Sequence, residues 1–144
     1  MASPPAGRRR RGCVVSTSER EGPSFFLIDE LPWPDETRGT APRELVEEAR
    51  RKGARRKFLA RGQGGFHSQY SDFPAGYTVP PHSHDHDEMI VVLEGSCTML
   101  GGGPTLKAYD SMVLIGGYEY GFTAGDDGMK FLTIRTGEAQ TQLA

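Results

Sequence analysis

The sequence predicts an all-β protein, a barrel or sandwich of short antiparallel strands with one short helix near its beginning. From residue 57 onward, short apolar stretches alternate with clusters rich in Gly, Pro and Asp. Such clusters favour hairpins, because Gly and Asp adopt positive φ at low cost. No second helix of useful length interrupts this pattern, which is typical of a β-sandwich or barrel. The candidate strands are KFLA, FHSQYSDF, EMIVVLEG, CTML, LKAYDSMVLI, YEYGF and MKFLTIRT.

The residues before the barrel divide into two parts. Residues 1–22 are rich in Pro, Gly, Ser and Arg and contain little to bury, so they are expected to form a disordered basic tail. Residues 23–56 are expected to pack on the barrel, which takes up residues 57–144. They begin with an apolar stretch, Phe25–Ile28, that is expected to be a strand. Trp33 follows between two prolines and is expected to plug one end of the core.

The stretch TAPRELVEEARRKG predicts a short helix. Thr40 is in a position to cap its start, and Pro42 suits the first turn because a missing N–H does no harm there. Gly53 is expected to end the helix. An apolar stripe of Leu45, Val46 and Ala49 would then face the barrel.

Length, charge and cysteine usage limit the class of protein. The 144 residues are enough for one domain, and the net charge is only −2. The N-terminal half is the more basic, but its arginines alternate with glutamates, so a nucleic-acid partner is not expected. No apolar run approaches the ~20 residues that cross a bilayer, and no signal peptide is evident. Two distant cysteines form no redox or metal motif, which leaves the cytoplasm as the expected compartment.

Three of the four histidines lie within the stretch VPPHSHDHDEMIVVLEGS. Alternate residues of an extended strand share one face, so His82, His84, His86 and Glu88 would point the same way on a regular strand. Imidazole nitrogen with carboxylate oxygen suits Fe, Mn, Ni or Zn. The alternative is a solvated polar loop. Because a carboxylate stands beside the histidines and a buried strand follows at once, the metal site is favoured.

The spacing of this stretch resembles the first signature of the cupin superfamily. Gly76, His82, His84, Glu88 and Gly95 match every fixed position of that signature. The resemblance implies a double-stranded β-helix, the cupin barrel. It also implies that His82, His84 and Glu88 hold a divalent metal inside the barrel, with His86 as a neighbour near the rim.

In the second signature of the superfamily, a histidine normally supplies a fourth ligand, and here Tyr120 takes that register. Three roles are open for Tyr120. It can coordinate as a phenolate, transfer protons near a substrate with a pKa lowered by a nearby cation, or pack in the core. Proton transfer is the catalytic role we assign to it. His67 is a second candidate for the missing ligand, and is otherwise a surface or core histidine.

The resemblance implies an enzyme that acts on a small oxygenated molecule such as a ketone, phenol or acid. A non-haem dioxygenase is the first expectation, with Tyr70 and Arg135 lining the barrel mouth and Arg135 binding a carboxylate. A redox-silent metal-dependent isomerase, cyclase or lyase is the alternative, and a ligand-binding module without turnover is a third. A homodimer, paired through the strand expected at 25–28, is also expected.

Overall fold

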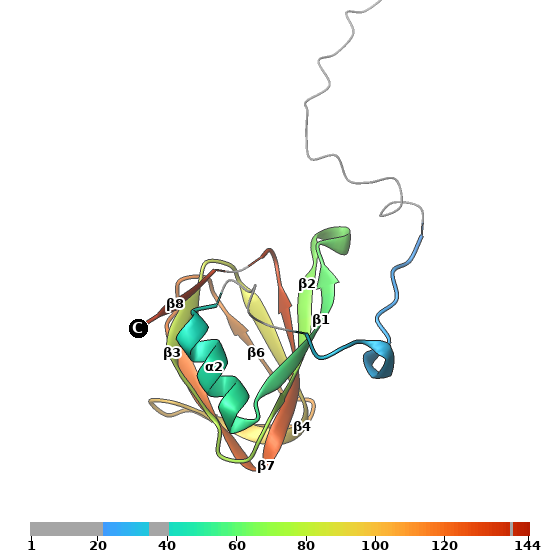
Figure 1. Ribbon diagram of the computed structural model, residues 1–144. Coiled ribbons are helices and arrows are strands. Elements are labelled where there is room, and N and C mark those ends of the chain that lie inside the picture. The colour runs from blue at the N-terminus through green and yellow to red at the C-terminus, as the bar shows by residue number, and fades with distance from the viewer. Residues whose placement is uncertain (1–21, 35–40, 139) are drawn as a thin grey trace, which may run out of the picture.

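A computed structural model of the protein describes residues 22–34, 41–138 and 140–144, and nearly all of the expected tail lies outside them. Figure 1 shows a sheet rolled into a barrel, with one helix across its side. The strands are β1 (Arg55–Arg61), β2 (His67–Phe73), β3 (Thr78–His84), β4 (Glu88–Met99), β5 (Thr105–Lys107), β6 (Ser111–Leu114), β7 (Tyr120–Arg135) and β8 (Thr141–Leu143). The helical elements are η1 (Ile28–Glu30), α2 (Arg43–Lys52) and η3 (Gln63–Gly65).

The strands pair in the order β1-β2-β7-β3-β8, and β4 pairs with β5, β6 and β7. Every one of these pairs is antiparallel. The all-β prediction is therefore confirmed, together with the short helix before the barrel. The two strands expected on either side of AGDDG form one long strand, β7. The last strand, β8, was not predicted from the sequence.

The longest strand, β7, bends back so that its two ends face the same interior. A straight strand of its 16 residues would span roughly 50 Å. Yet Tyr120 at one end and Arg135 at the other both contact Glu88. The bend lies where β4 and β7 change register, around Gly95. Gly95 has φ +74°, and a Cβ on it would lie 2.0 Å from the carbonyl oxygen of Gly128. Only glycine fits this close crossing of two strands.

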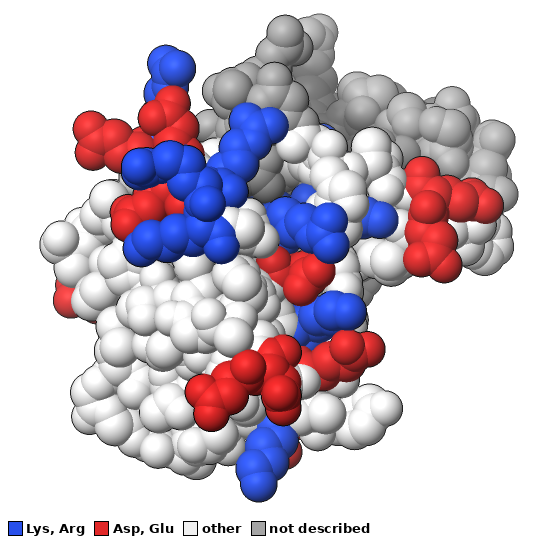
Figure 2. Space-filling view, turned by 60° about the horizontal axis from the view of Figure 1, so that its bottom comes forward, with Lys and Arg blue, Asp and Glu red and all other residues white. Residues whose placement is uncertain are grey.

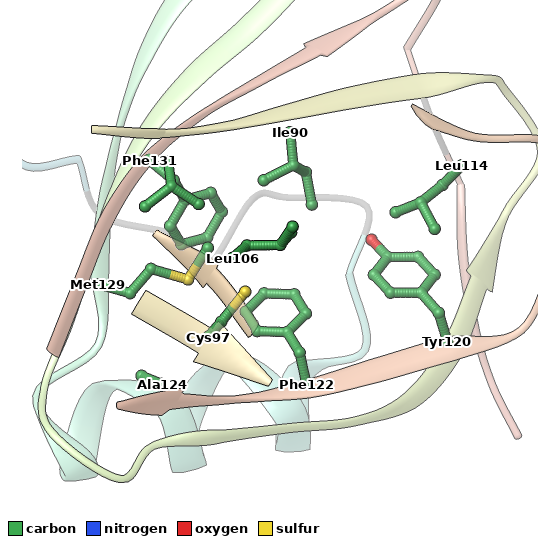
Figure 3. Packing of buried hydrophobic residues seen from close by; sticks show 10 residues of the cluster. Ile90, Cys97, Leu106, Leu114, Tyr120, Phe122, Ala124, Met129 and Phe131 are labelled. Carbon is green, nitrogen blue, oxygen red and sulfur yellow. The ribbon is translucent and has the colours of Figure 1, made fainter. Parts of the chain in front are cut away.

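The core fills the barrel end near this bend. Phe122, Phe131 and Ile90 point toward one another across the interior, and Tyr120 lies beside them with its hydroxyl directed inward (Figure 3). The Phe122 and Tyr120 rings lie nearly parallel, with centroids 6.3 Å apart. Other fully buried members of this core are Val92, Cys97 and Met129.

Helix α2 covers one side of the barrel (Figure 1). Its apolar residues Leu45, Val46 and Ala49 are half-buried, and the remaining positions from Arg43 to Lys52 are exposed. Gly53 ends the helix as predicted, with φ 90° and its N–H directed to the carbonyls of Ala49 and Arg50. Thr40, the expected N-cap, lies outside the described residues.

Two predictions for the segment before the helix are wrong. Residues 25–28 form no strand: the chain enters η1 at Ile28, and Phe25 is 78% exposed. A strand needs a partner, and none of the described strands pairs with this stretch. Trp33 does not plug the core. It is 40% exposed and lies on the outer surface, with the Arg55 guanidinium 4.0 Å from its ring. The homodimer, which relied on this strand, stays a prediction.

The surface mixes charges of both signs. On the face seen in Figure 2, Lys and Arg alternate with Asp and Glu. Several of these charges form local ion pairs, such as Arg43 with Glu47 and Lys130 with Glu94. None of the helices in the described ranges is both long enough and apolar enough to cross a membrane.

Candidate functional site

A cavity of about 150 Å³ lies inside the barrel, between helix α2 and the strands. One part of its wall is polar, with His82, His84, Tyr120, Gln69 and Arg135. The rest of the wall is mostly apolar and comes from the barrel core and from the inner face of α2. It includes Leu45, Val46, Ala49, Phe73, Tyr77, Val79, Ile90, Phe122 and Phe131.

Strand β3 carries both histidines into this cavity. His82 and His84 are two residues apart, so they share one face of the strand, and both are buried. The Nδ1 of His82 lies 2.8 Å from the carbonyl oxygen of Pro80. A carbonyl can only accept, so Nδ1 carries the proton and Nε2 is left with its lone pair. The Nδ1 of His84 pairs with the hydroxyl of Thr141 at 3.1 Å. Each ring therefore has its Nδ1 occupied and its Nε2 free of a protein donor.

Glu88 is not on the strand that carries the two histidines, although a single regular strand was expected to hold all three residues. Strand β3 ends at His84, a short bend follows, and Glu88 begins β4. In the sheet its neighbour is Arg135, and the Arg135 Nε donates to Glu88 Oε2 at 2.9 Å. The Tyr120 hydroxyl donates to Glu88 Oε1. The carboxylate, only 3% exposed, is therefore held by two donors from opposite ends of β7.

Burial sets the protonation of these groups. It lowers the pKa of the His84 imidazole to about 4, although the nearby Glu88 charge opposes the shift. Burial lowers the pKa of His82 as well. The pKa of Tyr120 is raised, first by burial and then by the Glu88 carboxylate that accepts its hydrogen bond. Burial and Glu88 outweigh the Arg135 cation, which lowers the pKa of Tyr120. Tyr120 is a hydrogen-bond donor to Glu88 here, and the lowering expected beside a bound metal cation stays a prediction.

The predicted metal ligands converge, but they do not form a complete metal site. The two imidazoles suit a divalent metal, because each presents a free Nε2 while its Nδ1 is held in place. The carboxylate accepts one hydrogen bond at each oxygen, from Tyr120 and from Arg135, and each oxygen keeps a further lone pair. His84 Nε2 and Glu88 Oε1 are 3.8 Å apart. In the described part of the chain, no group of three His, Cys, Asp or Glu is placed to hold a metal ion.

The other candidate residues lie outside the cavity. His86 does not line the cavity and pairs with Asp85 at 2.9 Å. His67 sits at the start of β2, near Gly62, and does not line the cavity. Tyr70 does not line the barrel mouth, because it points to the outer face of β2, where its ring lies 6.3 Å from that of Trp33.

The sequence did not predict two polar residues that line the cavity, Gln69 and Thr141. Gln69 lines the cavity and accepts hydrogen bonds at Oε1 from Arg135 and Arg56, at 3.3 and 3.4 Å. The alternation of His67, Gln69 and Ser71 on one face was visible, but not which face turns inward. Thr141 belongs to the unexpected strand β8, whose pairing with β3 brings it to His84. No pattern in the sequence predicted strand β8.

Several solved structures share this fold. The polyketide cyclase RemF from Streptomyces resistomycificus matches with a TM-score of 0.64 and 17% identity, covering 85% of this chain and 86% of that one. KdgF from Halomonas sp. matches with a TM-score of 0.60 and 24% identity, over 80% and 94% of the two chains. An RmlC-like cupin from Shewanella frigidimarina matches with a TM-score of 0.60 and 17% identity, covering 79% of this chain and 90% of that one.

The sequence itself matches no protein-family model and no curated protein. The structural matches therefore establish the fold, and at these identities they do not extend to the reaction. The chain has the cupin fold, which confirms the barrel that the first signature implied.

Proposed function

We propose that this cupin-fold chain is an enzyme that binds a small oxygenated organic molecule inside its barrel and transfers a proton on it. Isomerases, cyclases and lyases share this chemistry. The observation that carries the proposal is the convergence of a free imidazole Nε2, a phenol and a guanidinium on one cavity wall. The structural likeness to a polyketide cyclase is consistent with it.

Each polar group has a defined part in such a reaction. Arg135 binds and orients a carbonyl or carboxylate oxygen, and its positive charge stabilises negative charge that develops there. The His82 Nε2 accepts a proton from the carbon next to that group, because its Nδ1 is fixed as the donor to Pro80. Tyr120 returns a proton to the substrate when its hydroxyl turns from Glu88 toward the cavity, and the proton taken up by the neighbouring His82 ring then restores the phenol. The apolar wall excludes water from the reacting carbon.

The test is proton exchange with solvent. The protein is incubated in D2O with a panel of small keto acids, diketones and catechols, and loss of the C–H signal is followed by proton NMR. Tyr120→Phe should slow exchange about a hundredfold or more, because general acid–base groups contribute that much. Tyr118→Phe is the matched control, since that side chain is 63% exposed. Equal rates for wild type and Tyr120→Phe would remove Tyr120 from the mechanism, and binding without exchange would favour a ligand-binding module.

A metal-dependent enzyme, including the expected dioxygenase, is the second candidate. It is favoured by the two histidines, which leave both Nε2 atoms free for a metal. When bound, a divalent metal would act as a Lewis acid toward substrate oxygens, and iron would add redox chemistry. Glu88 would then be a third ligand, beside its hydrogen bonds from Tyr120 and Arg135 or in place of one of them.

This candidate has its own measurement. Protein purified without a tag should retain a divalent metal in stoichiometric amount, and His82→Ala or His84→Ala should each lose it. Oxygen uptake on the same panel then separates the dioxygenase from redox-silent chemistry, because only the dioxygenase consumes oxygen. Unchanged metal content in both histidine variants would exclude these residues as ligands.

A further inference from the structure

The size of the cavity limits its ligand. Its volume of about 150 Å³ is near that of an engineered apolar protein cavity that accepts one benzene molecule. A single six-membered ring with one short substituent therefore fills this space. Two fused rings would exceed this volume, and would have to project through the open side of the cavity or displace helix α2, which forms part of the wall through Leu45, Val46 and Ala49.

The charged groups on the cavity wall are all positive. Arg55, Arg56 and Arg135 line it, and no Asp or Glu is among its lining residues within the described chain. Arg55 is paired with Asp72 and Arg135 with Glu88, both of which lie outside the lining. The histidines add no negative charge. Glu88 is buried and outside the lining, where it accepts from Arg135 and Tyr120. A wall of this kind favours a bound anion over a neutral or cationic molecule.

Two hydrogen-bond donors on this wall remain available. Arg135 uses Nε for Glu88 and Nη1 for Gln69, and no residue in the described ranges accepts from its Nη2. Gln69 accepts both of its guanidinium bonds at Oε1, which leaves its amide Nε2 as a second donor. A guanidinium and an amide side by side match the two oxygens of one carboxylate.

Another part of the wall is aromatic. The Phe73 ring lies edge-on to Phe131, with centroids 4.9 Å apart, and to Tyr77 at 4.8 Å. The Phe122 ring is 6.2 Å from Phe73. Such a group of rings accepts the face or edge of another ring at favourable geometry. The cavity is therefore amphipathic, with carboxylate donors on one part of its wall and aromatic rings on another.

From these observations we propose that the ligand of this cavity is a monocyclic organic carboxylate, with its acid group on Arg135 and Gln69 and its ring among Phe73, Phe122 and Phe131. This inference rests on the proposed function in one respect: it names the substrate class of the same site. It concerns binding and does not depend on which proton moves.

Calorimetric titration with four probes tests the proposal. Benzoate should bind in a one-to-one ratio. Benzamide has the same shape without the charge and should bind at least about tenfold more weakly, since hydrogen bonds to a charged group are the stronger ones. Acetate lacks the ring, and 1-naphthoate has a second one that the cavity volume does not hold, so both should bind more weakly than benzoate. Equal binding of benzoate and benzamide, or no binding of benzoate, would overturn the proposal.

Variants on helix α2 locate the binding. Ala49→Trp fills the cavity from a half-buried helix position and should abolish benzoate binding. Glu44→Trp adds the same side chain on the exposed face and should leave it unchanged. Benzoate that still binds to the folded Ala49→Trp protein occupies another place, and the proposal fails. Arg135→Lys keeps the charge with fewer donors, and it should weaken benzoate more than benzamide.

The two proposals fail in different ways. If benzoate binds as described but no acid on the panel exchanges its proton, the ligand class stands and the enzymatic function fails. If proton exchange occurs on uncharged diketones while benzoate does not bind, the enzyme stands and the carboxylate class fails.

Discussion

Replacing Gly95 with alanine is expected to lower the free energy of unfolding by more than about 2 kcal/mol. Two effects add. The residue has φ +74°, where any side chain is strained. The added Cβ would also lie 2.0 Å from the Gly128 carbonyl oxygen, so β4 and β7 would have to move apart at the bend. Urea denaturation of wild type and variant measures the difference.

A second glycine separates the two effects. Gly76 has φ +73°, almost the same conformation, but nothing lies within 4 Å of the position where a Cβ would be. Gly76→Ala should therefore show only the conformational strain, about 1 kcal/mol. A Gly95→Ala variant no less stable than Gly76→Ala would mean that the close crossing of β4 and β7 contributes little to the fold.

The same bend explains why the first cupin signature predicted the barrel correctly. Gly95 is its last fixed position, and the bend there lets β7 return its two ends to Glu88. The alternation of His82 and His84 was readable because both lie on one regular strand, where the period of two holds. Local pattern and turn chemistry were sufficient for these features.

What the sequence could not predict depends on contacts between distant strands. Arg135 is 47 residues from Glu88, and only the register of β4 with β7 makes them neighbours. Spacing alone predicted Glu88 as a metal ligand, but it carried no information on the hydrogen-bond donors Tyr120 and Arg135. Thr141 likewise reaches His84 only through the pairing of β8 with β3. The prediction of a strand at 25–28 was wrong for a related reason. A strand forms only where a partner strand pairs with it, and the sequence does not show whether one does.

The ion pair between Glu88 and Arg135 should make the second large contribution to stability. Arg135→Met leaves a carboxylate that is 3% exposed with Tyr120 as its remaining donor. Removing one partner of a buried pair typically costs about 3–5 kcal/mol, and we expect a loss in that range at neutral pH. Glu88→Gln should cost less, because the amide oxygen still accepts from Tyr120 and the Arg135 side chain is 17% exposed.

The double variant measures the coupling. If the pair acts as argued, Arg135→Met with Glu88→Gln should be more stable than Arg135→Met alone, because no buried charge is then left without a partner. If the loss in free energy of unfolding of the double variant, measured by urea denaturation, equals the sum of the losses of the two single variants, this argument is contradicted. The measurement needs no substrate and no metal, so it is independent of both proposals for function.

The same variant also tests whether Arg135 competes with a metal for Glu88. Arg135→Met frees Glu88 Oε2 while His82 and His84 keep their Nε2 atoms free. Ni²⁺ binds imidazole and carboxylate together, and a ligand that binds only the folded state raises the melting temperature. Nickel should therefore stabilise Arg135→Met more than wild type, and the added substitution His84→Ala should remove that gain. Equal stabilisation of wild type would mean that the guanidinium does not keep a divalent ion from the carboxylate, and the metal-dependent candidate would then gain over the metal-free one.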